Sequence, residues 1–137
     1  MAIQHFRELR VYEQAVQLRR RVFELSKRWP KAEQYALTDQ IRRSSRSIGA
    51  NVAEAWSKRR YERHFVSKLT DAHAEAAETN VWLDVALECG YIGEEEHTAL
   101  QTLCDRIGGG LVKMMREPEK WCGPASLIRE EETPYLP

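Results

Sequence analysis

Four stretches of this chain repeat apolar residues every three or four positions, and this helical period is the feature that most limits its fold. The stretches run from about Leu9 to Trp29, from Glu33 or Ala36 to Lys58, from Glu62 to Cys89, and from just after Gly93 to about Arg116. No stretch of useful length alternates apolar and polar residues as a half-buried strand does. The sequence therefore predicts an all-α protein.

The residues at the ends of these stretches are types that start and stop helices. Pro30 lacks an N–H group and restricts the residue before it, so it should end the first helix. Gly90 stands where a left-handed C-terminal cap is expected. Short connections between long helices favour an antiparallel up-down-up-down four-helix bundle. We expect this bundle to occupy residues 1–116, followed by a Pro-rich, acidic C-terminal tail at 117–137.

The second helical stretch contains small and polar residues, as "SRSIGANVAEAW" at 45–56 shows. Ser45 and Ala55 share the apolar sector of this helix with Ile48, so a neighbouring helix could approach closely there. Gly49 costs about 1 kcal/mol relative to alanine, and the triplet 108–110 costs roughly 2–3 kcal/mol in total. Such costs predict close contacts or a kink. The alternative is that the triplet is only tolerated and the helix frays locally.

Charge is divided unevenly along the 137 residues, although the net charge is zero. Residues 1–68 contain 16 Lys and Arg against 7 Asp and Glu, a net charge of +9, whereas residues 69–137 contain 5 against 14, a net charge of −9. Halves this unlike attract each other or meet different partners. No window approaches the roughly 20 apolar residues of a membrane helix, and the charges within the first 14 residues do not suggest export. We expect a cytoplasmic protein with no membrane partner.

Residues suited to catalysis are sparse. Di-metal sites in helical bundles use two Glu-x-x-His motifs, and only Glu94 and His97 form one here. The three cysteines are odd in number, lack metal-type spacing and have no basic neighbours in sequence that would lower a thiol pKa. A phosphate-binding glycine loop is absent from the sequence. We therefore expect no enzyme activity, no metal and no cofactor.

Basic clusters are the strongest chemical feature. Arginine binds phosphate with two parallel hydrogen bonds, and a row of cations gains sequence-independent affinity for nucleic acid by releasing counterions. Tyr61 lies beside one cluster, within reach of a base for stacking. The alternative is that the cations form a solvated face or pair with the acidic residues of the third and fourth helices. The candidate nucleic-acid-binding residues are Arg42, Arg43, Arg46, Lys58, Arg59, Arg60 and Arg63.

The third helix has two apolar stripes. One contains Phe65, Leu69 and Leu83 and would face the core of the bundle. A helix that is apolar on both sides needs two partners, so the second stripe is a candidate interface between subunits. Its residues are Ala74, Ala77, Val81, Trp82 and Val85.

Two segments resemble a known family. They are "FRELRVYEQA" at 6–15 and "P..E.Y.L..QIRR...SI..NVAE", which runs from Pro30 to Glu54. From His5 to about Arg116 the chain resembles the S23-like family of proteins encoded in 23S rRNA intervening sequences, which is related to the accessory variability determinant of diversity-generating retroelements. The resemblance implies a four-helix protomer, a ring-like homopentamer and no enzyme activity. In the retroelement branch it also implies a basic surface that binds nucleic acid and a reverse transcriptase.

Together these patterns predict a homo-oligomeric helical bundle that binds RNA or DNA through its basic clusters. The alternative is a structural scaffold or protein-interaction module without nucleic-acid binding. Apolar residues of the tail, including Leu127 and Ile128, could dock it on the bundle, and the acidic run at 130–132 would permit the tail to cover the basic face.

Overall fold

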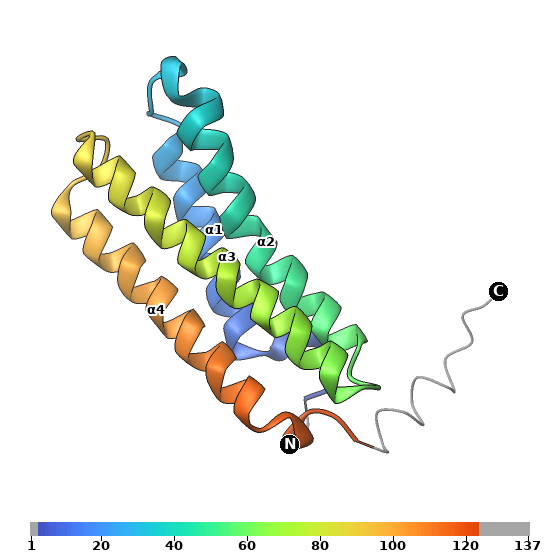
Figure 1. The fold of residues 1–137 in the computed structure, drawn as a ribbon. Helices are drawn as coiled ribbons and strands as arrows, with labels where there is room; N and C mark the ends of the chain where they lie inside the picture. The colour runs from blue at the N-terminus through green and yellow to red at the C-terminus, as the bar shows by residue number, and fades with distance from the viewer. Residues whose placement is uncertain (1–2, 124–137) are drawn as a thin grey trace.

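A computed structural model describes residues 3–123, which form an elongated bundle of helices (Figure 1). These residues contain four α-helices, namely α1 (Arg10–Ser26), α2 (Asp39–Ser57), α3 (Glu62–Glu88) and α4 (Glu94–Arg116). Short turns flank them: 3-10 turns η1 (Phe6–Glu8), η2 (Lys31–Glu33) and η4 (Pro118–Lys120), and the π-helical turn η3 (Gln34–Thr38). Residues 3–123 include no strand, which confirms the expected all-α class for this part of the chain.

Helices that follow one another in sequence pack side by side, and α4 returns to contact α1. Within the described residues the α2–α3 contact is the most extensive of these and the α1–α4 contact the least. None of the helices in this range combines the length and apolar character needed to cross a bilayer. The tail residues Leu127, Ile128 and 130–132, together with Tyr135 and Leu136, lie outside the described residues.

The expected cap at the end of α3 is confirmed. Gly90 has a φ of +75°, a left-handed conformation that glycine adopts without steric cost. Its N–H donates to the carbonyl of Leu87, and the N–H of Tyr91 donates to that of Ala86 at 2.9 Å. This pair of bonds is the Schellman motif. After the turn, the Glu96 side chain accepts a hydrogen bond from the N–H of Gly93, and α4 begins at Glu94 as predicted.

The connection between α1 and α2 differs from the expectation. The last α-helical residue of α1 is Ser26, three residues before Trp29, because a single turn carries the chain from Lys27 into extended Pro30. Pro30 disfavours the helical conformation of Trp29, and residues 27–29 instead form a turn in which the N–H groups of Arg28 and Trp29 donate to the carbonyls of Leu25 and Ser26. The chain then passes through η2 and η3, so α2 itself begins at Asp39 rather than at Glu33 or Ala36.

The core lies along the bundle axis and receives buried residues from every α-helix. Fully buried side chains include Leu18, Ile41, Ile48, Phe65, Leu69, Leu83, Leu100, Ile107 and Leu111. On α1 the buried face is Val11, Ala15, Leu18 and Val22, whereas Tyr12, Val16 and Phe23, apolar residues of the same helical period, are only half-buried. The helix is thus rotated so that Phe23 lies at the edge of the core beside α2.

Small residues allow close contact between helices, as the sequence predicted. A Cβ atom on Gly49 would lie 3.3 Å from Cε1 of Tyr12 on α1, and Gly49 is buried. On the other side of α2 the buried hydroxyls of Ser44 and Thr79 lie 2.8 Å apart, so each is satisfied inside the α2–α3 contact. In the glycine triplet of α4, a Cβ atom on Gly110 would lie 2.6 Å from Cγ1 of Val11.

The glycine triplet offers a matched pair of substitutions. Gly110→Ala forces Val11, whose branched side chain has few alternative rotamers in a helix, out of its position. We expect a net loss of about 1 kcal/mol in the free energy of unfolding, because overpacking outweighs the gain in helix propensity. Gly109 meets nothing within 4 Å, so Gly109→Ala should instead stabilise by about 0.5–1 kcal/mol. Urea denaturation of both variants measures the difference, and equal stabilisation by both would contradict the close approach at Gly110.

Candidate nucleic-acid interface

A basic cluster forms around one aromatic ring where α1 and α2 lie side by side. The centroid of the Phe23 ring lies 4.7 Å from Cζ of Arg42, 4.8 Å from Nζ of Lys27 and 5.7 Å from Cζ of Arg46. The Nε of Arg42 also donates to the Oγ of Ser26 at 2.8 Å. We call Phe23, Lys27, Arg42 and Arg46 the Phe23 cluster. Cations at these distances are attracted to the ring, which holds them in place without neutralising them.

Lys27 has a carboxylate partner, Glu24, at 3.2 Å, but both side chains are more than half exposed and the pair is weak. Arg42 and Arg46 form no ion pair with any acidic residue in the described part of the chain. They border an open hollow on α2 together with Asp39 and Arg43. Two uncompensated guanidinium groups with an aromatic support make this surface suited to an anion.

Arg43 differs from its neighbours because it pairs with α3. Its Nη2 atom lies 2.7 Å from Oε2 of Glu78 and 3.2 Å from Oε1 of Glu75, and its Nη1 atom also donates to Glu75. The hydrogen bond from Arg43 holds the pKa of the Glu78 carboxyl below its usual value, and the same contact raises the pKa of Arg43. For Arg43 this arrangement agrees with the alternative prediction, in which the basic residues pair with acidic residues of the third and fourth helices.

A second basic cluster lies in the turn between α2 and α3, and we call it the turn cluster: Lys58, Arg59, Arg60 and Arg63. The guanidinium of Arg59 lies 3.6 Å from the ring centroid of Trp56, and its Nε donates to the Trp56 carbonyl at 2.8 Å. The side chain of Tyr61 is 57% exposed, with its ring edge-on to His64 at 5.3 Å. An exposed aromatic ring among cations can stack on an unpaired base.

The structure separates the two clusters. Arg46 and Lys58 are twelve positions apart on and just after α2, which corresponds to about 18 Å along the helix axis at 1.5 Å per residue. The candidate residues therefore form two sites rather than one. Neither Phe23 nor Lys27 was predicted as a member of the first site, although their spacing of four positions places them on the same face of a helix.

The second stripe of α3 lies at the surface, as an interface between subunits requires. Ala74 and Ala77 are exposed, and Val81 is 53% exposed, which makes it one of the large apolar residues that the described surface presents to solvent. Trp82 and Val85 are half-buried at the border of the core. Trp82 donates from Nε1 to Glu78 at 3.2 Å, so the edge of the stripe is tied to the ion pair of Arg43.

The residues considered for catalysis have other partners or environments. His97, the histidine of the Glu-x-x-His motif, places Nε2 2.8 Å from Oδ1 of Asp84. Burial raises the pKa of the Cys104 thiol to about 12 and that of Cys122 to about 11, which disfavours the reactive thiolate. Among residues 3–123, no group of three or more His, Cys, Asp or Glu side chains is arranged to hold a metal ion.

Comparison with known proteins agrees with the resemblance carried by the two sequence segments. The crystal structure of a protein of unknown function from the S23 ribosomal protein family of Bacteroides thetaiotaomicron VPI-5482 matches with a TM-score of 0.70 and 28% sequence identity. The match covers 77% of this chain and 95% of that chain. No curated protein matches the chain. The model of the family described as 23S rRNA-intervening sequence protein matches residues 7–113. The chain therefore belongs to the 23S rRNA-intervening sequence protein family.

Proposed function

We propose that the protein is a non-catalytic, self-associating helical bundle that binds the phosphate backbone of RNA or DNA. The observation that supports binding is the Phe23 cluster, in which Arg42 and Arg46 lie on an aromatic ring and make no ion pair with a described carboxylate. Arginine held in this way loses less side-chain freedom on binding phosphate, because its position is set beforehand. The turn cluster supplies a second set of cations with Tyr61 as a stacking platform.

Self-association supports the same function. The exposed stripe of Ala74, Ala77 and Val81 gives α3 a second apolar surface, and a second copy of the chain would bury it. Each added copy repeats both basic clusters, so an assembly of neutral chains would bind a long polyanion at many points. The family resemblance implies a ring of five copies. We further propose that each protomer is an antiparallel up-down-up-down bundle over residues 1–116, which the short connections and the contacts between successive helices support.

The competing function is a scaffold or protein-interaction module that binds no nucleic acid. The ion pairs of Arg43 with Glu75 and Glu78 favour it, because they show that part of the basic half is neutralised inside the protomer. The two functions differ in what Arg42 and Arg46 do, and these residues can be tested against Arg43 as an internal control.

Binding is tested by titrating the full-length protein into labelled RNA hairpins and DNA duplexes at several salt concentrations. Replacing Arg42 and Arg46 together by glutamine should weaken binding to all sequences and reduce the slope of log affinity against log salt by about 2, since two phosphate contacts are lost. Arg43→Gln should leave the slope unchanged, because Arg43 is already paired. Equal effects of both variants, or no binding by the wild type at low salt, would favour the scaffold.

The ion pair of Arg43 predicts a pH-dependent stability. The pKa of Glu78 is lowered in the folded protein, so the ionised Glu78 stabilises the folded state. This stabilisation is present above the ordinary carboxyl pKa and is lost as the pH falls through the pKa of Glu78 in the folded protein. Arg43→Gln should therefore lower the free energy of unfolding at pH 7 by up to about 1 kcal/mol, a small value because the pair is partly exposed. The gap to wild type should close in strong acid. Urea denaturation at both pH values measures it, and a gap that persists in acid would rule out the ionic contribution.

The subunit interface is tested by placing a charge in the stripe. Val81→Glu should convert the assembly to smaller species in light scattering, since burying an unpaired carboxylate costs several kcal/mol. Gln17→Glu, at an exposed position of α1, is the matched control and should leave the size unchanged. Circular dichroism checks that both variants keep their helices. A Val81→Glu variant of wild-type size would place the interface elsewhere.

A further inference from the structure

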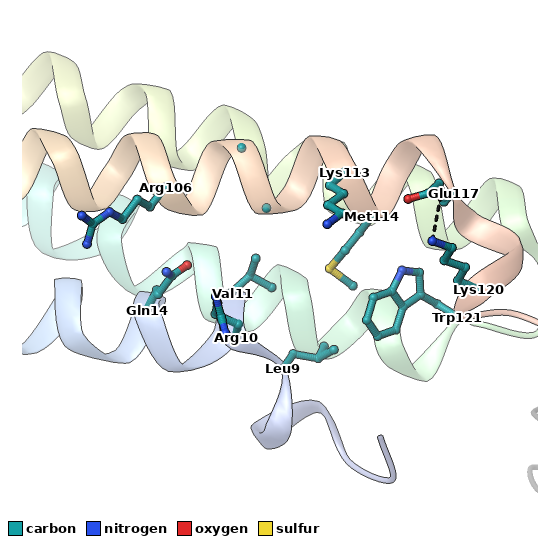
Figure 2. A pocket seen from close by; sticks show the side chains of 12 residues that line it. Leu9, Arg10, Val11, Gln14, Arg106, Lys113, Met114, Glu117, Lys120 and Trp121 are labelled. Carbon is teal, nitrogen blue, oxygen red and sulfur yellow. Dashed lines mark ion pairs between the residues drawn. The ribbon is translucent and has the colours of Figure 1, made fainter. Parts of the chain in front are cut away.

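A groove runs between the first half of α1 and the second half of α4, where these two helices make their limited contact (Figure 2). Its volume is about 730 Å³, within the range of sites that bind ligands. The α4 wall is low at Gly109 and Gly110, which have no side chains. Figure 2 shows Leu9, Met114 and Trp121 gathered at one end, with Gln14 and Arg106 at the other.

The groove combines apolar and basic residues in a definite order. Leu9 and Met114 are the apolar residues nearest Trp121, and Val11 lies beside Arg10 in the middle of the groove. Lys113 lies beside Met114, and Arg10 and then Arg106 follow along the length of the groove. Neither Arg10 nor Arg106 forms an ion pair with a carboxylate of the described residues. By contrast Lys120, at the mouth, pairs with Glu117 at 2.8 Å.

In the segment that follows Trp121 in sequence, apolar residues come before acidic ones, an order that complements the apolar and basic parts of the groove. Trp121 lines the groove, and only two residues later the described part of the chain ends at Gly123. After three further residues come the apolar pair Leu127 and Ile128, followed by Arg129 and three successive glutamates at 130–132. We propose that the groove is the binding site for this C-terminal segment of the same chain, with Leu127 and Ile128 at the apolar end and the glutamates at Arg10 and Arg106.

The lengths agree with this pairing. Met114 and Arg106 are eight residues apart on α4, about 12 Å along the axis. An extended segment covers the same distance in four residues at roughly 3.3 Å each, which is the separation between Leu127 and Glu131. The six residues from Trp121 to Leu127 can span up to about 20 Å, enough to turn back into the groove. Because the segment is tethered at the mouth, its effective concentration is of millimolar order, and even a weak contact would be populated.

Methionine methyl NMR on the full-length protein tests the proposal. Met114 lines the groove, whereas Met115 faces the other way with its sulfur 3.3 Å from the Thr70 hydroxyl, and so serves as an internal control. Replacing Leu127 and Ile128 together by serine should shift the Met114 methyl resonance and leave that of Met115 in place. Changing the three glutamates to glutamine, or adding salt, should shift Met114 in the same direction. Leu136→Ser, a matched change outside the proposed contacts, should shift neither.

A charge swap tests the ionic part directly. Arg10→Glu combined with Arg106→Glu should release the segment and shift Met114. Changing the three glutamates to lysine in that same protein should restore the original resonance. A Met114 resonance that no tail variant moves would overturn the proposal. So would a shift that disappears on dilution, which would assign the segment to another copy, or a shift produced only by an added amphiphile such as dodecyl phosphate.

Discussion

The close helix contacts at Gly49, Gly110 and Ser44 depend on side chains too small to hold the helices apart. Gly49 admits the ring of Tyr12, Gly110 admits Val11, and the hydroxyls of Ser44 and Thr79 satisfy each other where α2 meets α3. Protein interiors are packed as tightly as organic crystals, so one added methyl group at such a point moves a neighbour. The basic residues of α2 project from the same turns as Ser44 and Gly49, and these contacts therefore fix which helix each arginine meets.

The helices could be predicted closely because their signals are local. Gly90 marks the end of α3 because glycine adopts the left-handed cap, and Glu94 marks the start of α4 because negative charge is favoured at a helix N-terminus. Both residue types can be read directly from the sequence. The segment before α2 could not be read in this way, since 3-10 and π-helical turns leave no distinct mark in a pattern of period 3.6. The orientation of α1 about its own axis could not be predicted from the sequence either. The apolar period of α1 does not distinguish Phe23 from the core residues, and only the position of α2 shows that its ring supports Arg42 and Arg46.

The candidate site shows why a cluster of like residues in sequence need not act together. Successive residues of an α-helix differ in direction by about 100°, so Arg42 and Arg46 point within about 40° of each other while Arg43 points well away from Arg42. Arg42 and Arg46 consequently lie on the α1 side, and Arg43 lies on the α3 side against Glu75 and Glu78. The sequence identified all three as basic, but assigning their partners required knowing which helix stands on each side of α2.

The neighbours of each basic residue determine where the uneven division of charge along the sequence leaves positive charge on the surface. Where the basic half meets α3, carboxylates neutralise it, as they do at Arg43. On the side of α2 that faces α1, Arg42 and Arg46 contact the ring of Phe23 rather than a carboxylate. On the other side of α1, Arg10 and Arg106 face a groove without a described acidic partner. Positive charge thus remains on both sides of α1 in a chain of zero net charge, and any polyanion or acidic segment that binds should do so there.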